Sequence, residues 1–225
     1  AVRKIDGMGP AWGNSLFEDA AEYGLGMAVT TALRRKALRT RVQEVLMEGR
    51  DSPISPELYA QLQEWNDNYG DWKIADRLTK TLPPLLAAEA GTDPVMLQIS
   101  AMTDMLPKMS MWTIGGDGWA YDIGFGGLDH ALASGQDHNI LVLDTEVYSN
   151  TGGQTSKSTP FGAIAKFASS GREQNKKSLA DMAMSYGNVY VANCSMGASM
   201  QQTLRAFIEA EAFPGPSLVI AYSPC

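Results

Sequence analysis

The sequence has few residues of the kinds that build disulfide frameworks or zinc sites. Its 225 residues include only two cysteines, Cys194 and Cys225, and only two histidines. Two cysteines cannot form a disulfide framework, so a free thiol or a metal ligand in a reducing compartment is the better interpretation. The chain also lacks an apolar run of about 18 residues and, at its amino end, the apolar core of a signal peptide. We therefore expect a cytoplasmic protein that does not contact membranes.

The chain also has fewer basic than acidic side chains. Lysine and arginine number 18 against 25 aspartates and glutamates, which gives a net charge of −7. The one dense basic block, Arg34-Arg35-Lys36, lies in a helical pattern, and we interpret it as a solvated helix face. Nucleic-acid binding through phosphate neutralisation is therefore disfavoured.

The length of the chain and the residues at its two ends indicate how many domains to expect. A chain of 225 residues is long enough for one or two domains with a sizeable core. It begins at Ala1 without Met and stops at Cys225, directly after a strand-like run at 217–222. We interpret residues 1–225 as one domain, the C-terminal segment of a longer multidomain chain.

Apolar spacing in the N-terminal third predicts helices. The pattern predicts a helix over 16–38, a polar stretch over 39–72 with a short helix at 56–65, and an amphipathic helix over 74–89 interrupted at Pro83-Pro84. We therefore expect a helical insertion at about 39–90.

After Pro107 short apolar runs alternate with helical patterns. Strands are expected at 111–114, 139–144, 189–192 and 217–222, and helices at 124–134, 178–186 and 199–213. This alternation is typical of an α/β protein. The prediction is a mostly parallel sheet with helices on both faces, and the helical insertion attached to it.

Two polar loops leave the carboxyl ends of predicted strands, which is where open parallel sheets bind ligands. In the first loop, Asp117 follows Gly115-Gly116 and precedes Gly118. Because glycine has no Cβ, the backbone amides there can approach an anion closely. The second, 145–159, offers oxygen ligands from Thr145, Glu146, Tyr148, Ser149 and Asn150. A carboxylate beside a diphosphate fits a bridging Mg²⁺ or Ca²⁺. One alternative is a simple tight turn. The other, a dinucleotide-binding loop, is disfavoured because its glycine fingerprint fails at Tyr121.

Other conspicuous residues are interpreted structurally. His130 and His138 are expected to be surface or packing residues, the methionines to fill the core or interfaces, and Cys194 to be a small buried hydrophobe. Gly152 to Thr159 is either an ordinary loop or a mobile cover over the site.

Gly116-Asp117-Gly118, followed 33 positions after Asp117 by Asn150, resembles the cation and diphosphate motif of thiamine diphosphate enzymes. The phrases GGDGWAYDIGFGGLDH at 115–130 and LDTEVYSNTGGQTSKSTP at 143–160 resemble the pyruvate:ferredoxin (flavodoxin) oxidoreductase family specifically. The resemblance continues at 9–24 and 213–225, and so extends over nearly the whole chain. It implies a thiamine diphosphate-binding fold.

The resemblance also implies roles for particular residues. Mg²⁺ would be held by Asp117, the Thr145 hydroxyl and the Val147 carbonyl. Thiamine diphosphate would lie against two groups of residues: Gly116, Asp117, Gly118 and Trp119; and Thr145, Glu146, Val147, Tyr148, Ser149 and Asn150. Asn150 would lie close enough to the reacting centre to be catalytic, and Cys225 would be the fourth ligand of a 4Fe-4S cluster.

The activity implied by the resemblance is oxidative decarboxylation of pyruvate with coenzyme A to acetyl-CoA and CO₂, with electrons passing through iron-sulfur clusters to ferredoxin or flavodoxin. Other domains of the same enzyme, a homodimer by the resemblance, would supply the remaining cluster cysteines and the glutamate that acts on the cofactor's aminopyrimidine. The alternatives are an oxidoreductase for another 2-oxo acid and, for the isolated segment, a non-catalytic module.

Overall fold

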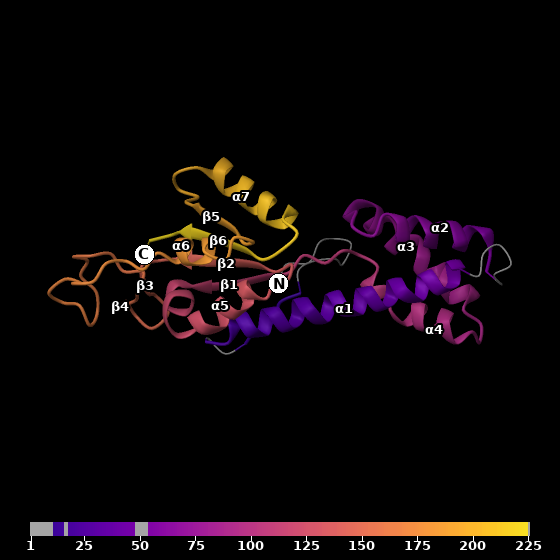
Figure 1. Ribbon diagram of the computed structural model, residues 1–225, viewed down its shortest axis with the longest axis horizontal. Coiled ribbons are helices and arrows are strands. Elements are labelled where there is room, and N and C mark those ends of the chain that lie inside the picture. The colour runs from indigo at the N-terminus through magenta and orange to yellow at the C-terminus, as the bar shows by residue number, and fades with distance from the viewer. Residues whose placement is uncertain (1–10, 16–17, 48–53, 225) are drawn as a thin grey trace. The chain divides into compact units, whose positions relative to one another are not determined.

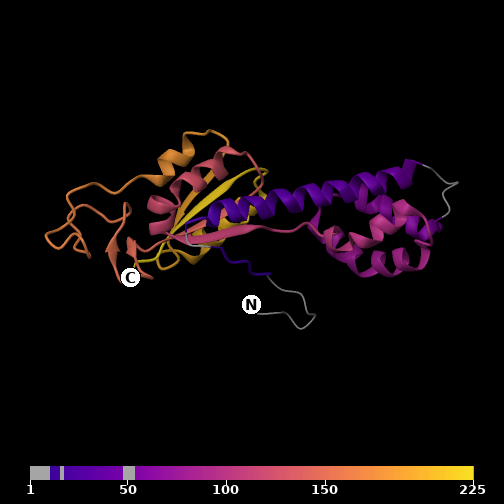
Figure 2. The ribbon, with the colours of Figure 1, turned by 90° about the horizontal axis from the view of Figure 1, so that it is seen from below.

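A computed structural model of the chain describes residues 11–15, 18–47 and 54–224 (Figure 1). The chain falls into two compact units, one made of residues 1–28 and 111–225 and the other of residues 29–110. The boundary lies within helix α1 (Ala20–Met47), which is one unbroken helix (Figure 2). The expected insertion at about 39–90 lies inside the second unit.

The first unit is built on a four-stranded parallel sheet. Its strands are β1 (Trp112–Gly116), β2 (Asn139–Asp144), β5 (Tyr190–Cys194) and β6 (Ser217–Tyr222), in the order β1-β2-β6-β5. In the register, Gly115 lies opposite Val142 and Leu141 lies opposite Val219. All pairs are parallel, so the four carboxyl ends meet at one edge of the sheet.

Helices cover both faces of this sheet. Alternate residues of β2 point to opposite faces: Ile140 and Val142 pack with helices α5 (Phe125–Ala133) and α6 (Leu179–Met184), whereas Leu141 packs with helix α7 (Met200–Ala212). Figure 1 shows α7 and α5 on opposite sides of the sheet. The predicted fold class is confirmed.

The turns after β1 and β2 differ from ordinary connections. Directly after Asp117 the chain forms a π-helical turn, η3 (Gly118–Ile123), in which the Gly124 N–H donates to the Trp119 carbonyl over 2.8 Å. Such turns are rare and occur often at functional sites. After β2 the chain forms a short antiparallel pair, β3 (Val147–Tyr148) and β4 (Gln154–Thr155).

The second unit consists of helices with a core of their own. They are the remainder of α1, α2 (Pro56–Asp67), α3 (Trp72–Glu89), α4 (Pro94–Ala101) and the 3₁₀ turn η2 (Thr103–Met105). Ser55, Asp71 and Asp93 cap the first turns of α2, α3 and α4 with their side chains, as residues of these types commonly do. Leu38, Leu62 and Trp65 are among the residues buried at the centre.

Two helix boundaries predicted from the sequence are wrong. α1 continues to Met47 rather than ending at 38, because Leu38, Val42 and Val45 keep the helical spacing and are buried. α3 passes through Pro83-Pro84 without a break. Pro84 lies on the exposed side, where water can bond the freed carbonyls, while Leu82 and Leu86 on the buried side hold the helix in place.

Arg35 corrects the interpretation of the basic block as a solvated face. Its side chain is buried, and Nη2 donates to the carbonyls of Tyr69, over 2.8 Å, and Leu106, over 3.3 Å. The guanidinium stacks 4.0 Å from the centre of the Tyr69 ring, and burial lowers its pKa. Arg34 and Lys36 are exposed as expected, and Arg34 pairs with Asp104.

No helix among the described residues is long and apolar enough to cross a bilayer.

Candidate functional site

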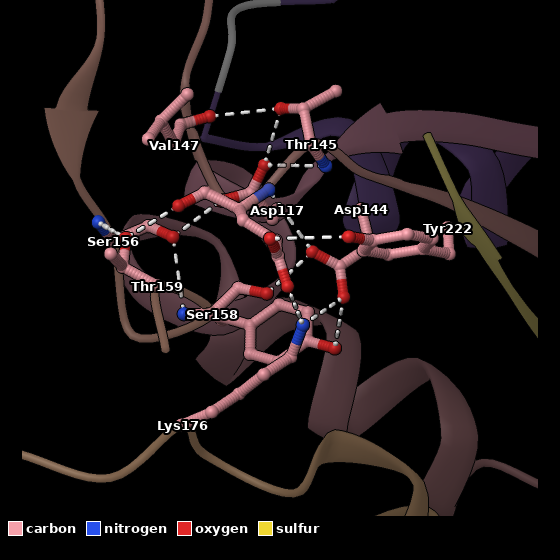
Figure 3. A network of polar contacts seen from close by, with 11 residues as sticks. Asp117, Asp144, Thr145, Val147, Ser156, Ser158, Thr159, Lys176 and Tyr222 are labelled. Carbon is pink, nitrogen blue, oxygen red and sulfur yellow. Dashed lines mark hydrogen bonds and ion pairs between the residues drawn. The ribbon is translucent and has the colours of Figure 1, made fainter. Parts of the chain in front are cut away.

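The two loops singled out in the sequence leave neighbouring strands and meet at the carboxyl edge of the sheet. β1 and β2 are paired, with Gly116 opposite Leu143, so the turn at Asp117 lies beside the loop that starts at Asp144 (Figure 3). The prediction that these loops share one site depends on this pairing, and the pairing is present.

Asp117 is the centre of the site. Its side chain is buried, and Oδ1 accepts hydrogen bonds from the Thr145 N–H over 3.2 Å and the Thr145 hydroxyl over 2.8 Å. Oδ2 accepts a hydrogen bond from the Ser156 hydroxyl. Burial raises the pKa of Asp117, while the bonds from Ser156 and Thr145 act in the opposite direction. A buried carboxylate held this way is well placed to bind a cation.

The Thr145 hydroxyl lies close to both of the other proposed cation ligands. The Thr145 hydroxyl lies 2.8 Å from Asp117 Oδ1, 2.9 Å from the Val147 carbonyl oxygen and 2.7 Å from the Ser149 hydroxyl. An octahedral Mg²⁺ with oxygen ligands at about 2.0–2.1 Å would hold neighbouring ligands roughly 2.9 Å apart. The separations of the Thr145 hydroxyl from Asp117 Oδ1 and from the Val147 carbonyl oxygen agree with that value.

In the part of the chain that the structure describes, no group of three or more His, Cys, Asp or Glu residues could hold a metal ion. A set of one carboxylate, one hydroxyl and one carbonyl is typical of a hard cation that also takes phosphate oxygens and water.

Asp144, at the end of β2, organises the loop around the cation ligands. It is buried, pairs with Lys176 Nζ at 2.7 Å, and accepts hydrogen bonds from the hydroxyls of Tyr121 and Ser158 (Figure 3). Burial, followed by the charge of Asp144, raises the pKa of Tyr121. The backbone carbonyl of Asp144 accepts the Ser223 N–H over 2.9 Å, which ties β6 to the site.

Glu146 is oriented differently from the other oxygen donors. Its backbone has a left-handed φ of 64°, and its carboxylate lies 3.4 Å from Lys176 Nζ and accepts a hydrogen bond from the Tyr222 hydroxyl over 3.5 Å. The carboxylate is thus engaged with Lys176 and Tyr222, while the backbone carbonyl accepts the Thr159 hydroxyl.

Glycine is required where the first loop packs against aromatic rings. A Cβ on Gly118 would lie 2.3 Å from the Tyr148 ring, whose hydroxyl donates to the Gly118 carbonyl over 3.1 Å. By contrast, a Cβ on Gly116 would meet nothing within 4 Å, which leaves open space beside the backbone for an anion. The Trp119 side chain is buried in the core, so only its backbone is left to face a ligand.

The second loop divides into an exposed and a buried part. Ser149 and Asn150 are exposed in the turn between β3 and β4. Ser156, Ser158 and Thr159 are buried and bonded to Asp117, Asp144 and Glu146. Of the two interpretations, ordinary loop and mobile cover, these hydrogen bonds favour the first for Ser156, Ser158 and Thr159.

Lys176 is a site residue that sequence reasoning missed. It reaches Asp144 and Glu146 from 32 and 30 positions further along the chain, and the only local signal is a Lys-Lys pair before a helix. Such a pair usually marks a solvated face.

The remaining candidate residues lie where packing residues are expected. His138 is buried, with Nε2 2.7 Å from the Thr113 hydroxyl, and burial lowers its pKa to about 4. Cys194 is buried and free, and burial raises its pKa. The predicted cluster ligand Cys225 lies outside the described residues.

A comparison with known protein families identifies a related domain. A family profile described as "Thiamine pyrophosphate enzyme, C-terminal TPP binding domain" matches residues 81–221, which include Asp117, Thr145 and Val147. Thiamine pyrophosphate is another name for thiamine diphosphate.

Several whole enzymes are similar to the chain. Identity is 54% to a mitochondrial NADP(+)-linked pyruvate dehydrogenase of Euglena gracilis, 55% to a pyruvate-flavodoxin oxidoreductase of Klebsiella pneumoniae and 51% to a pyruvate:ferredoxin oxidoreductase of Moorella thermoacetica. Each alignment covers 97% of this chain but only 12, 18 and 19% of these relatives, respectively.

One solved structure is also similar, a 2-oxoglutarate:ferredoxin oxidoreductase from Magnetococcus marinus. The alignment covers 52% of this chain and 40% of the solved chain, at 24% identity and a TM-score of 0.47.

The family profile matches well over half of the sequence. The chain therefore belongs to the thiamine pyrophosphate enzymes and contains their C-terminal TPP-binding domain.

Proposed function

We propose that this chain is the diphosphate-binding part of an enzyme that decarboxylates pyruvate oxidatively with coenzyme A, giving acetyl-CoA and CO₂ and passing electrons to ferredoxin or flavodoxin. The observation that carries the proposal is the close approach of Asp117 Oδ1 and of the Val147 carbonyl to the Thr145 hydroxyl at the sheet edge. These oxygens would hold Mg²⁺ or Ca²⁺, with the cofactor's diphosphate beside Gly116 and the loop from Thr145 to Asn150. Bound thiamine diphosphate would supply the carbanion-stabilising chemistry that decarboxylation needs.

The residues of this chain would bind and orient the cofactor and its cation. Asp117 supplies the fixed negative charge, and Ser156 and Thr145 hold its two oxygens in position. Asp144 and Lys176 pin the ligand-bearing loop to the sheet. Asn150, exposed at the tip of the turn, is the residue we propose to lie nearest the substrate.

The relatives support a shared role for this segment. Enzymes named for NADP(+), flavodoxin and ferredoxin match the chain at 54, 55 and 51% identity. Since identity does not follow the electron acceptor, we propose that this segment carries the cofactor site common to all three. Other domains of the same polypeptide would complete the active site, in a cytoplasmic homodimer.

A second candidate is an oxidoreductase for a different 2-oxo acid. The names of the relatives favour pyruvate, and turnover of the full-length enzyme on pyruvate and on 2-oxoglutarate distinguishes the two. Faster turnover of 2-oxoglutarate would replace the proposed substrate but leave the cofactor site unchanged.

The cofactor proposal is tested by Asp117→Ala in the full-length enzyme. Outer-shell changes at metal sites already cost about 10–100-fold in affinity, so loss of a direct ligand is expected to weaken Mg²⁺-dependent thiamine diphosphate binding by at least about 100-fold. Equilibrium binding of thiamine diphosphate, with and without Mg²⁺, measures this. Asp67→Ala, at an exposed position in the helical unit, is the control. Unchanged affinity in Asp117→Ala would exclude the proposed site.

The iron-sulfur proposal concerns Cys225. We propose, from the resemblance, that its thiolate completes a 4Fe-4S cluster whose other ligands lie in other domains. Cys225→Ala is expected to lower the iron content of the full-length enzyme by about one cluster, or four iron atoms per chain. Cys194→Ala, which removes the buried free thiol, is expected to leave iron unchanged. Equal iron in both variants would contradict the assignment.

A further inference from the structure

A polar cavity of about 440 Å³ lies next to the predicted cation site without being part of it. It is lined by Asp122, by residues 155–157 at and after β4, and by residues 167–174. Ser156 belongs to both places, because it lines this cavity and donates its hydroxyl to Asp117. The cavity is therefore adjacent to the site but is formed by a different segment of the chain.

Two side chains that line this cavity have buried polar atoms without partners among the described residues. They are Nε and Nη1 of Arg172 and Oγ1 of Thr155. Burying a polar group without a hydrogen bond is costly, and burying part of a guanidinium is more so. Such groups are rare in folded proteins unless a ligand or ordered water satisfies them.

Backbone hydrogen bonds anchor the chain at both positions. The Arg172 N–H donates to the Ala163 carbonyl over 3.0 Å, and its own carbonyl accepts the Gly162 N–H over 2.8 Å. The Thr155 N–H donates to the Lys166 carbonyl over 2.9 Å. The unsatisfied groups thus come from anchored backbone positions, as a preformed site requires.

Among the described residues, neither carboxylate at the cavity forms an ion pair with Arg172. Asp122 is engaged by Lys157, through an ion pair of 3.3 Å and a hydrogen bond from the Lys157 N–H of 2.9 Å. Glu173 is exposed. Phe167, which also lines the cavity, is 88% exposed and holds a left-handed φ of 70°. Bulky residues rarely adopt this conformation, and it often marks functional sites.

From these observations we propose that Arg172 and Thr155 form an anion-binding site, separate from the predicted cation site, for the phosphate or carboxylate group of a small molecule. Guanidinium groups bind both anions through paired N–H donors, and the Thr155 hydroxyl adds another donor. The exposed Phe167 ring offers an apolar surface for the organic part of the ligand. Because binding can be measured without turnover, this site can be tested independently of the proposed reaction.

The test uses the full-length enzyme saturated with Mg²⁺ and thiamine diphosphate, so that the cofactor site cannot take up the probe. Binding of inorganic phosphate is followed by ³¹P line broadening, and binding of acetate by ¹H line broadening, at constant ionic strength. Arg172→Gln is expected to weaken binding of the better probe at least about tenfold, as loss of a charge-assisted hydrogen bond does. Arg172→Lys is expected to restore part of the affinity.

Two further variants keep the test decisive. Arg205→Gln removes the same charge from an exposed position on α7 and is expected to bind like the wild type. Thr155→Val preserves the shape of a half-buried side chain and is expected to weaken binding severalfold even if Arg172→Gln fails to fold. Preference for phosphate would identify a phosphate ester as the ligand class, and preference for acetate a carboxylic acid. The proposal is overturned if neither probe binds the wild type, or if both Arg172→Gln and Thr155→Val bind as tightly as the wild type.

Discussion

Buried polar side chains in this protein take their partners from distant positions in the sequence. Asp117 is held by Thr145 and Ser156, Asp144 by Lys176, and Thr113 by His138. Each contact joins a strand end to a loop or a neighbouring strand. At the scale of single residues, this explains why polar groups occur inside the sheet unit without disrupting it, since most are hydrogen-bonded.

The buried His138 gives the sheet unit a predictable pH dependence. Its pKa is about 4 in the folded protein against 6.5 for an unperturbed histidine, because burial disfavours the charged ring. Between these values the unfolded chain binds a proton that the folded chain does not. The stability contributed by neutral His138 is therefore present above pH 6.5 and is lost as the pH falls toward 4, by roughly 1.4 kcal/mol per pH unit.

Urea unfolding of His138→Gln across this pH range measures the effect. The variant is expected to be less stable at neutral pH but to lose less stability on acidification than the wild type. His130→Gln, at an exposed position, should follow the wild-type slope. The same slope in all three proteins would show that His138 does not titrate as expected.

At the scale of elements, glycines at the start of α5 have opposite roles. Gly124 joins η3 to α5, where a Cβ would lie 2.1 Å from the buried Trp119 ring and 2.8 Å from the Glu18 carbonyl. Gly126, in the first turn of α5, is exposed, and its Cβ would meet nothing within 4 Å. The first glycine is required by packing, and the second only adds backbone entropy to the unfolded chain.

Alanine substitutions are expected to separate these roles. Gly124→Ala should destabilise the protein by about 1–3 kcal/mol, because neither the Trp119 ring nor the backbone can move aside. Gly126→Ala should stabilise it by about 0.5–1 kcal/mol through helix propensity. Thermal or urea unfolding of the pair measures both. Destabilisation by Gly126→Ala as large as that by Gly124→Ala would contradict the packing argument.

At the scale of the whole molecule, the two units have separate cores. Leu62 lies in the core of the helical unit, and Leu218 lies in the core of the sheet unit. Leucine-to-alanine changes in cores cost about 2–5 kcal/mol, depending on how far the surroundings collapse. Since the two cores are distinct, we expect each substitution to affect mainly its own unit.

Native-state hydrogen exchange tests this independence. Leu62→Ala is expected to speed exchange in α2 and α3 while leaving β2 and β6 protected. Leu218→Ala should do the reverse. Parallel loss of protection in both units, from either substitution, would mean that the chain unfolds as one cooperative body.

Much of the fold and part of the site were determined by the sequence alone. Strand and helix positions after Pro107 follow from local apolar spacing, and the oxygen donors at Asp117, Thr145 and Val147 lie beside strand ends that the same spacing locates. The end of α1 and the continuity of α3 were missed because burial of one helix face outweighs local polarity and proline content. The roles proposed for these residues come from the family resemblance and not from the spacing.

Only the tertiary structure decided which polar groups meet. Arg35 is buried because Tyr69 and Leu106 offer carbonyls from distant helices and turns, and Lys176 joins the site because its loop returns to the end of β2. The unsatisfied nitrogens of Arg172 are likewise visible only once the loop has folded. The physical reason is the same in each case: hydrogen bonding and desolvation depend on three-dimensional neighbours, whereas apolar periodicity is written along the chain.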